Sequence, residues 1–227
     1  MTTSSQPGVR AAASAEPLTL RERKKLRTRR ELIDTALELF TEKGFEATTL
    51  DELCAEVEVS KRTFFRTFDS KEDVAMAPTQ DLWAAFVDEL ESCDPAGRPL
   101  IEVLRDVLLA ALARMTGEGW ARRVLLSRHL TERTPSMGAH GLHFCDRTVR
   151  VAEEIVRRRI TLSGASDLRL RLVLDMMVAA FHSAMDEWSD LPGDPSREAL
   201  AACFRRAFAA IPGSIATTAA LREHTAR

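Results

Sequence analysis

Apolar residues recur at three- and four-residue steps along most of this chain, the spacing that lines one face of an α-helix. The pattern is clear between residues 32 and 40, where Leu32, Ile33, Leu37 and Phe40 share a face before Gly44 ends the segment. No stretch alternates with the two-residue period of a strand, and nothing repeats at a fixed longer period. The chain is therefore predicted to be all-α, with about nine helices.

Residues 48–73 predict two short helices joined by a tight turn and followed by a third helix. Thr49 can cap the first helix, and Glu52 stands at the position that completes a capping box. Glu58 and the residue after it make the turn, and Ser60 can cap the second helix. Ser70 is placed to cap the third helix.

The second of these helices has two chemically different sides. Phe64 and Phe68 lie four residues apart and are expected to face inward. The outward positions carry no acid and hold Lys61, Arg62, Thr63 and Arg66. A short helix held by aromatic residues and basic on its outer side is typical of the recognition helix of a helix-turn-helix.

Further helices follow, separated by segments rich in proline and glycine. The patterns place them at about residues 74–92, 100–115, 120–132, 135–160, 167–188 and 196–211. The predicted organisation is a disordered tail at 1–17, a helix-turn-helix DNA-binding domain at 18–73, and a larger helical domain for effector binding and dimerisation at 74–227.

The N-terminal third resembles the DNA-binding segment of the TetR family of bacterial regulators. The similarity lies in ALELFTEKGFEATTLDEL, then VSKRTFF, then F-x-SKED. It implies a homodimeric transcriptional regulator, usually a repressor, that binds a double-stranded DNA operator and answers to a small-molecule effector. Phe65 and Thr67 depart from the tyrosine and histidine common at these positions in the family, which changes the phosphate contacts expected there.

Charge is distributed unevenly, although the net charge is only −2. Seven of the ten residues from Arg21 to Arg30 are basic and one is acidic. Such a cluster before a helix-turn-helix is expected to follow DNA phosphates or enter the minor groove. The predicted DNA-binding residues are Arg21, Arg23, Lys24, Lys25, Arg27, Thr49, Ser60, Lys61, Arg62, Thr63, Phe65, Arg66, Thr67 and Lys71.

The four cysteines are widely spaced and form no CxxC motif. No secretory signal and no apolar run of membrane-spanning length is visible. These features predict a cytoplasmic protein with reduced thiols and no membrane partner.

Two sets of residues in the larger domain are candidates for binding. Large apolar residues from separate helices resemble the lining of an apolar effector pocket, as the family resemblance implies. The candidates are Trp83, Phe86, Leu108, Met115, Trp120, Met137, Phe144 and Met177. The helix at 167–188 is apolar almost all round, and the last helix carries one apolar stripe, so both are expected at a dimer interface. The interface candidates are Met176, Phe181, Met185, Trp188, Leu200, Phe204 and Phe208.

Two alternatives stay open at this point. His140, His143 and Cys145 form the one cluster of metal-type ligands, which would suit a metal-dependent enzyme, but a second pair at useful spacing is missing. The favoured interpretation therefore has no catalytic residue, no metal and no cofactor. A DNA-binding regulator whose second domain binds protein rather than a ligand is the other alternative.

Overall fold

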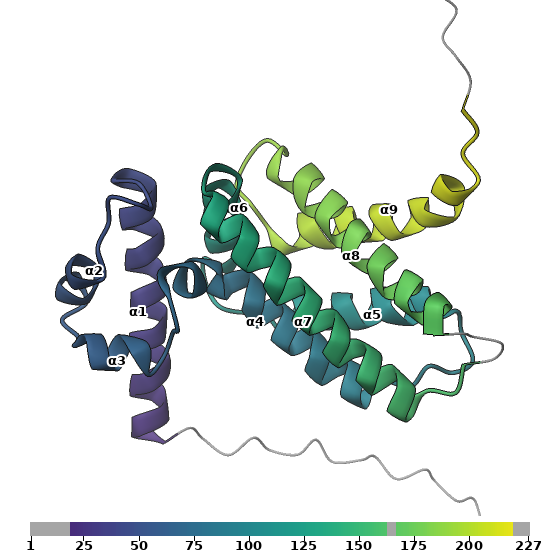
Figure 1. Cartoon of the computed structure of the whole chain (residues 1–227), viewed down its shortest axis with the longest axis horizontal. Helices are drawn as coiled ribbons and strands as arrows, with labels where there is room; N and C mark the ends of the chain where they lie inside the picture. Colours follow the sequence, from purple (N-terminus) through teal and green to yellow (C-terminus); the bar gives the residue numbers. More distant parts are fainter. Residues whose placement is uncertain (1–18, 163–166, 220–227) are drawn as a thin grey trace, which may run out of the picture.

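The computed structural model describes residues 19–162 and 167–219, and within these ranges it contains nine helices and no strand (Figure 1). The all-α prediction is confirmed. The tail predicted at 1–17 lies outside the described residues. The helices are α1 (Leu20–Glu42), α2 (Leu50–Glu56), α3 (Lys61–Phe65), α4 (Lys71–Ser92), α5 (Leu100–Ala113), α6 (Trp120–Arg133), α7 (Pro135–Arg159), α8 (Asp167–Ser189) and α9 (Arg197–Ile215).

The helix starts follow the capping signals in the sequence. The hydroxyl of Thr49 accepts a hydrogen bond from the Glu52 amide at 3.1 Å, and Ser60 accepts one from the Thr63 amide at 3.2 Å. Ser70 caps α4 in the same way. Between α2 and α3, Glu58 takes a positive φ of 53°, which turns the chain sharply enough for α3 to cross α2.

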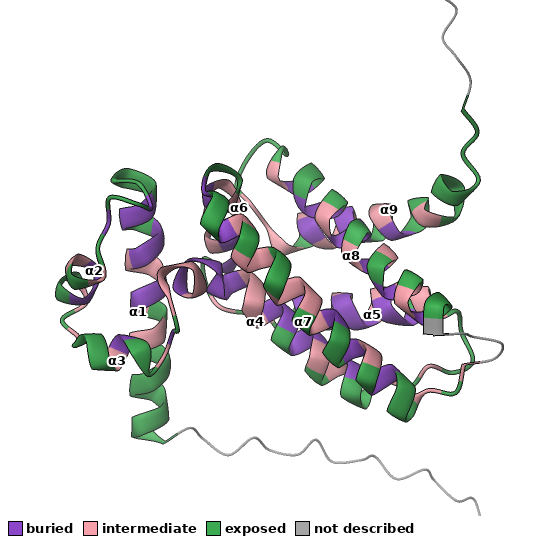
Figure 2. Cartoon of the chain, viewed as in Figure 1, coloured by how far each residue is buried: buried purple, intermediate pink, exposed green. Residues whose placement is uncertain are grey.

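The buried residues form two separate hydrophobic cores (Figure 2). The first joins α1, α2 and α3 to the first turns of α4, with Leu130 and Met137 added from the second part of the chain. We call these first elements, through Ala77, the N-terminal unit. The second core joins the rest of α4 to α5–α9, which we call the C-terminal bundle.

Helix α4 is shared by the two parts. It runs without interruption from Lys71 to Ser92, across the boundary predicted between residues 73 and 74. Val74 to Ala77 pack in the first core, whereas the residues from Leu82 onward pack in the second. The N-terminal unit and the C-terminal bundle are therefore joined by one continuous helix.

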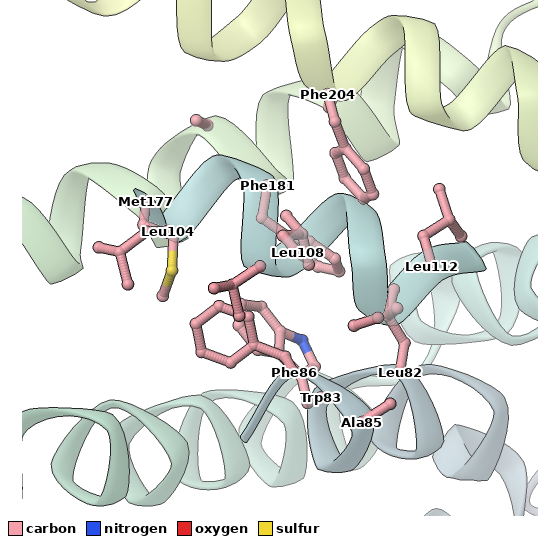
Figure 3. Close-up of a cluster of buried hydrophobic side chains, with 14 of the residues drawn as sticks. Leu82, Trp83, Ala85, Phe86, Leu104, Leu108, Leu112, Met177, Phe181 and Phe204 are labelled. Atoms are coloured by element: carbon pink, nitrogen blue, oxygen red, sulfur yellow. The ribbon is translucent and has the colours of Figure 1, made fainter. Parts of the chain in front are cut away.

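The centre of the bundle is made of large side chains from α4, α5, α8 and α9 (Figure 3). Phe181 stacks on Phe204 with ring centroids 5.5 Å apart, and its ring also lies 4.8 Å from that of Trp83. Phe86 and Leu108 are fully buried beside them. This packing ties the last two helices to the rest of their own chain.

The packing overturns most of the residue choices made for a dimer interface. Six of the seven candidates are at most 5% exposed in the single subunit: Phe181, Met185, Trp188, Leu200, Phe204 and Phe208. They cannot offer surface to a partner, because their own bundle already covers them. Only Met176 is partly exposed. The apolar pattern correctly predicted that these side chains are buried. It was wrong in predicting that a partner subunit buries them, because their own bundle does so.

Helix α9 also continues beyond the end expected near residue 211, passing through Pro212 to Ile215. A proline this close to a helix end removes only one main-chain hydrogen bond, so the last turn can still form.

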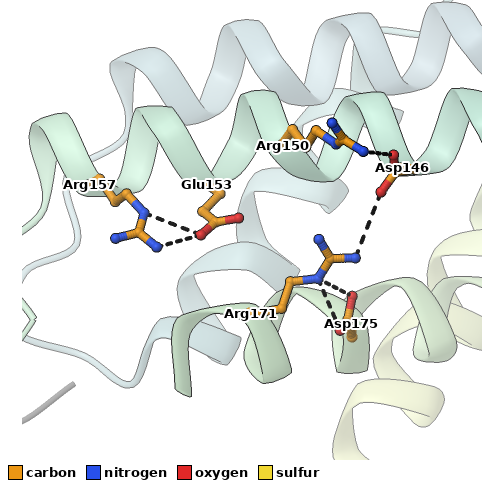
Figure 4. Close-up of polar contacts among 6 residues, drawn as sticks. All are labelled: Asp146, Arg150, Glu153, Arg157, Arg171 and Asp175. Atoms are coloured by element: carbon orange, nitrogen blue, oxygen red, sulfur yellow. Dashed lines mark hydrogen bonds and ion pairs between the residues drawn. The ribbon is translucent and has the colours of Figure 1, made fainter. Parts of the chain in front are cut away.

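Ion pairs lie on the surface where α7 meets α8 (Figure 4). Arg171 pairs with Asp175 at 3.0 Å and reaches Asp146 on α7 at 3.9 Å, contacts whose exposure limits their contribution to stability.

None of the helices in residues 19–162 and 167–219 has the length and hydrophobicity needed to span a lipid bilayer.

Candidate nucleic-acid interface and internal cavity

Helix α3 is anchored by its aromatic residues and presents its basic residues to solvent. Phe64 is fully buried and Phe68 is 3% exposed, with ring centroids 5.9 Å apart. Lys61, Arg62 and Arg66 are all exposed. The inward and outward faces lie as the sequence pattern predicted, so α3 offers a firmly held cationic surface.

The cations of α3 differ in how far they are already neutralised. Lys61 forms an ion pair with Asp51 of α2 at 2.8 Å, and both side chains are more than half exposed. Arg62 and Arg66 have no ion pair with any residue in the described ranges. The guanidinium groups of α3 are thus free to meet an anionic or hydrogen-bond-accepting partner, whereas Lys61 must first leave Asp51.

The two positions that depart from the family pattern have defined roles. The ring of Phe65 is 51% exposed and packs edge-on against Phe64, with centroids 5.4 Å apart. The hydroxyl of Thr67 donates to the carbonyl of Thr63 at 3.1 Å. Phe65 can therefore offer only its ring to a nucleic acid, and Thr67 already uses its donor within the helix.

Among the predicted DNA contacts, Lys71 is held by hydrogen bonds and a ring contact within the protein itself. Its ammonium donates to the carbonyls of Phe45 and Thr48 at 2.7 and 2.8 Å. It also lies 4.5 Å from the centroid of the Phe45 ring. These contacts fasten the loop between α1 and α2 to the start of α4, so Lys71 acts chiefly as a structural cation in the free protein.

The basic cluster forms the first turns of α1. Thr19 and Glu22 cap this helix reciprocally, and the five predicted contacts lie exposed on it: Arg21, Arg23, Lys24, Lys25 and Arg27. Arg27 pairs with Glu31 one turn on. Arg29 differs from them, because both of its terminal nitrogens bind the Asp81 carboxylate on α4 at 2.8 and 2.9 Å.

Two polar contacts join α1 to the C-terminal bundle. The bidentate pair of Arg29 and Asp81 joins α1 to α4. Arg123 of α6 binds Asp34 of α1 at 3.2 Å. Because both contacts reach α1, the orientation of the N-terminal unit depends on where α4 and α6 lie.

A cavity of about 300 Å³ lies among α4, α6, α7 and α8. Its walls are mainly apolar and aromatic, with Met76, Trp83, Phe144, Phe181 and Met185 among the lining residues. Its size is at the lower end of the range typical of small-molecule sites. Helix α4 contributes four lining residues in succession along one side, Met76, Thr79, Gln80 and Trp83.

Only Trp83 and Phe144 of the predicted pocket residues line this cavity. Phe86, Leu108, Met177 and Trp120 fill the bundle core, where Met115 packs at the edge, and Met137 is fully buried in the core of the N-terminal unit. Large apolar side chains look alike in sequence whether they fill a core or line a hollow. Gly138, whose missing side chain leaves open space on α7, was the signal that the prediction missed.

One side of the cavity is polar. Arg128 of α6 lines it and pairs with Asp186 and, through Nε at 3.0 Å, with Glu132. His182 lies next to this group, and its ring nitrogens have no hydrogen-bond partner in the described part of the chain. Burial lowers the pKa of His182, and the Arg128 cation lowers it further. The imidazole is therefore neutral at pH 7.

A surface groove of about 610 Å³ runs between α4 and α7 beside the cavity. Gln80, Trp83 and Phe144 line both the groove and the cavity. Phe144 is only partly buried, and Arg147 lies over its ring at 5.8 Å. The groove and the cavity are thus neighbouring hollows that share these three side chains.

The histidine and cysteine cluster on α7 does not gather into a ligand set. His140 faces α4, 3.4 Å from the Gln80 amide and 3.8 Å from the Asp73 carboxylate, whereas His143 is exposed. Cys145 lines the cavity, and burial raises the pKa of its thiol. Across residues 19–162 and 167–219, no three histidine, cysteine or acidic side chains converge on one point.

Comparisons with known proteins identify the family. Residues 32–77 match the family model described as "Bacterial regulatory proteins, tetR family". The chain is 35% identical over 193 residues to the HTH-type transcriptional regulator TcmR of Streptomyces glaucescens, covering 83% of this chain and 84% of that protein. The negative transcriptional regulator IcaR of the biofilm operon icaADBC from Staphylococcus epidermidis is 34% identical over 59 residues, which is 26% of this chain and 32% of IcaR.

A solved structure supports the fold. The fatty acid degradation regulator FadR from Bacillus halodurans superposes with a TM-score of 0.53 at 16% identity, covering 83% of this chain and 96% of that one. Because the similarity to TcmR extends over 193 residues, the family assignment rests on more of the chain than the helix-turn-helix. With α3 anchored and basic, and with TcmR aligned along most of the chain, this protein belongs to the TetR family of DNA-binding transcriptional regulators.

Proposed function

We propose that this protein is a repressor that binds a near-palindromic operator as a homodimer and is released from it by a small, largely apolar effector. The observation that supports DNA binding is the exposed cationic face of α3, which is held in place by two buried phenylalanines. Two copies related by a two-fold axis would place their α3 helices in successive major grooves, about 34–36 Å apart. In this scheme residues 18–73 bind DNA, residues 74–227 bind the effector and the partner, and α4 belongs to both.

Arg62 and Lys61 are proposed to read bases, because long basic side chains pair with O6 and N7 of guanine. Arg62 is the stronger candidate, since Lys61 is held by Asp51 in the free protein. Other groups are proposed to fix the position of the backbone: Thr49, Ser60, Thr63, Phe65, Arg66, Thr67 and Lys71 near the recognition helix, and Arg21, Arg23, Lys24, Lys25 and Arg27 on α1.

The proposed dimer uses the faces of α8 and α9 that their own bundle leaves uncovered. Leu168 is 67% exposed and Leu172 is 50% exposed on α8. On the same helix Met176 is partly exposed, and α9 adds small residues, Ala209 and Ala210, on its outer side. Small side chains let two helices approach closely, and the leucines provide apolar area, which favours a two-fold helical contact.

Release by an effector is proposed to act through α4. This helix supplies one wall of the cavity, and its first turns belong to the core of the N-terminal unit. Met76 takes part in both, since it lines the cavity and packs in that core. A ligand that fits best when α4 is displaced would reorient the N-terminal unit, and it releases DNA only because it binds that state more tightly.

Sequencing of genomic fragments retained by the purified full-length protein would define the operator. Binding to that operator and to single-base variants should then be compared for the wild-type protein, Arg62→Ala and Arg114→Ala. Arg62→Ala is expected to weaken binding by about 1–3 kcal/mol and to relax preference at one base pair in each half-site. Arg114, an exposed arginine of the bundle, should be neutral.

Equal weakening of Arg62→Ala on every operator variant would make Arg62 a phosphate contact and remove it as a base reader. Failure to retain any preferred sequence would overturn the operator proposal. Sedimentation at micromolar concentration tests the dimer separately, since a monomer would be incompatible with a palindromic operator.

A further inference from the structure

Helix α4 contains a proline at the point where its packing changes from one core to the other. Pro78 directly follows Ala77, the last α4 residue in the core of the N-terminal unit, and the bundle core begins at Leu82. A proline inside a helix cannot donate to the carbonyl one turn earlier, and its ring crowds that turn. Helices bend most readily at such positions. Pro78 is therefore a hinge between the N-terminal unit and the C-terminal bundle.

Helix α6 holds the hinge in place. The indole Nε1 of Trp120 donates a buried hydrogen bond to the carbonyl of Pro78 at 3.1 Å. Trp120 is only 6% exposed and packs in the bundle core. The hinge is thus fixed relative to the bundle, so bending at Pro78 rotates the N-terminal unit about a fixed point.

An ion pair between α1 and α4 spans this hinge. Arg29 binds both oxygens of the Asp81 carboxylate at 2.8 and 2.9 Å, and Asp81 lies about one turn beyond Pro78, on the bundle side. A bidentate pair of this kind fixes the relative orientation of the two groups as well as their distance. The same guanidinium lies 5.3 Å from the ring centroid of Phe68, the buried residue that anchors α3. Arg29 therefore links the support of the recognition helix to the far side of the hinge.

A second ion pair joins α1 to α6. Asp34 of α1 binds Arg123 at 3.2 Å. The Arg123 side chain is 15% exposed, and its other terminal nitrogen donates to the carbonyl of Glu118 at 2.8 Å, so the turn before α6 holds it in place. Because Asp81 and Arg123 both belong to the bundle, a rotation of the N-terminal unit about Pro78 must distort at least one of the two ion pairs.

Rotation about the hinge changes the position of α3. Helices α2 and α3 lie at the end of the molecule farthest from α5 (Figure 1), so a small change of angle at Pro78 displaces them. In a homodimer this displacement changes the separation and the relative twist of the two α3 helices. Both quantities must match the half-site spacing, since one base pair adds about 3.4 Å and about 35° of twist.

We propose that the ion pairs Arg29–Asp81 and Asp34–Arg123 fix the angle of the N-terminal unit at the Pro78 hinge and thereby determine which half-site spacing the dimer accepts. None of these four residues is among those proposed to contact DNA, so each is a positioning residue. The inference rests on the proposed operator binding as a homodimer. It adds to that proposal the residues that select the spacing of the half-sites, as distinct from their base sequence.

Operators that keep both half-sites but lengthen or shorten the centre by one base pair test this proposal. Binding of the full-length protein is measured by fluorescence anisotropy, and the spacing preference is the ratio of the affinities for the native and altered centres. Asp34→Ala/Asp81→Ala removes both ion pairs at partly exposed positions. Because the wild-type protein must distort these pairs to reach a wrong spacing, the preference should fall by roughly five- to twentyfold in this variant. Discrimination between the native half-site and its single-base variants should stay unchanged.

Asp88→Ala/Glu89→Ala is the matched control. Both carboxylates lie on α4 and pair with Arg114 inside the bundle, so this variant has the same change of charge while the hinge contacts remain. It should keep the wild-type spacing preference, whatever the added charge does to overall affinity. Equal spacing preference in Asp34→Ala/Asp81→Ala and the wild-type protein would refute the proposal, and so would an equal loss in the control.

Reversing one ion pair separates the effect of pairing from the loss of a side chain. Asp81→Arg places two arginines opposite each other and should lower the spacing preference. Adding Arg29→Asp restores opposite charges and should recover most of it. A folded Arg29→Asp/Asp81→Arg protein without recovery would contradict the proposal.

The wild-type protein provides a test that needs no variant. Salt weakens ion pairs that are open to solvent. It also weakens the phosphate contacts, but these are equal in number for the native and altered operators and cancel in the ratio of affinities. The spacing preference should therefore decline as salt increases, and a ratio independent of salt would refute the proposal.

Failure of this inference can be told apart from failure of the proposed function. A wild-type protein that retains no preferred operator would refute both. A wild-type protein that binds its operator normally, with a spacing preference that persists in Asp34→Ala/Asp81→Ala, would refute only the role of the two ion pairs.

Discussion

Replacing Lys71 by methionine should destabilise the N-terminal unit rather than act mainly on DNA affinity. The ammonium donates hydrogen bonds to the carbonyls of Phe45 and Thr48 at 2.7 and 2.8 Å and lies over the Phe45 ring. Methionine keeps the apolar stem of lysine but removes all three of these interactions. The connection between the α1–α2 loop and α4 would then depend on packing alone.

The magnitude follows from the number and setting of these interactions. Hydrogen bonds to a charged group contribute about 1.5–3 kcal/mol each, and a cation over an aromatic ring adds about 0.5–1 kcal/mol at an exposed site. Lys71 is only partly buried, so water can replace part of this stabilisation in the variant. We therefore expect the free energy of unfolding to fall by about 2 kcal/mol, less than the sum of about 3.5–7 kcal/mol that these interactions would give without solvent compensation.

Lys61→Met is the matched control. Lys61 is a lysine of the same unit whose one ion pair, with Asp51, is exposed on both sides, so its removal should change stability by less than about 1 kcal/mol. Urea unfolding followed by circular dichroism measures the difference, and amide hydrogen exchange in residues 45–56 locates it. Lys61→Met should weaken operator binding at nearly unchanged stability.

The reasoning would be refuted if Lys71→Met unfolded at the same urea concentration as Lys61→Met. A lower salt slope of operator binding in that folded variant would show instead that Lys71 binds a phosphate. The two lysines thus separate a structural cation from a recognition cation within one small unit.

Three further predictions concern the charge on α1, the bundle and the pH response. Neutralising the exposed basic residues at the start of α1 should lower the log–log salt slope of operator binding by about 0.9 for each DNA phosphate that the variant no longer binds, measured by fluorescence anisotropy; an unchanged slope would leave this charge in solvent. Phe204→Ala should lower the free energy of unfolding by about 3–5 kcal/mol, because it leaves a cavity in the bundle core. Leu172→Glu should leave the fold intact and shift sedimentation toward monomer. A folded but monomeric Phe204→Ala would place Phe204 at the dimer interface and contradict its assignment to the core. Because folding lowers the pKa of His182, the unfolded chain binds this proton first as pH falls below about 6.5, so the free energy of unfolding should decrease over that range; His182→Gln should remove this part of the dependence, and identical pH profiles would contradict it.

The sequence determined the local structure of this protein to a large extent. The caps at Thr49, Ser60 and Ser70, the break at Gly44 and the two faces of α3 all depend on residues within a few positions of one another. Interactions at such short separation are set by helix geometry and side-chain chemistry, so they can be read before any packing is known. The family resemblance rested on these same residues.

Only the tertiary structure decided what covers each apolar face and where space is left. Phe204 and Phe181 looked suitable for a partner subunit, but they stack inside their own bundle. Lys71 looked like a phosphate ligand, yet its ammonium is held by two carbonyls of a loop more than twenty residues earlier in the chain. A cavity is the space that side chains leave unfilled, here beside Gly138, and this depends on how four helices cross. Hydrophobic periodicity states that a face must be buried, but burial is not directional, so it cannot name the surface that buries it.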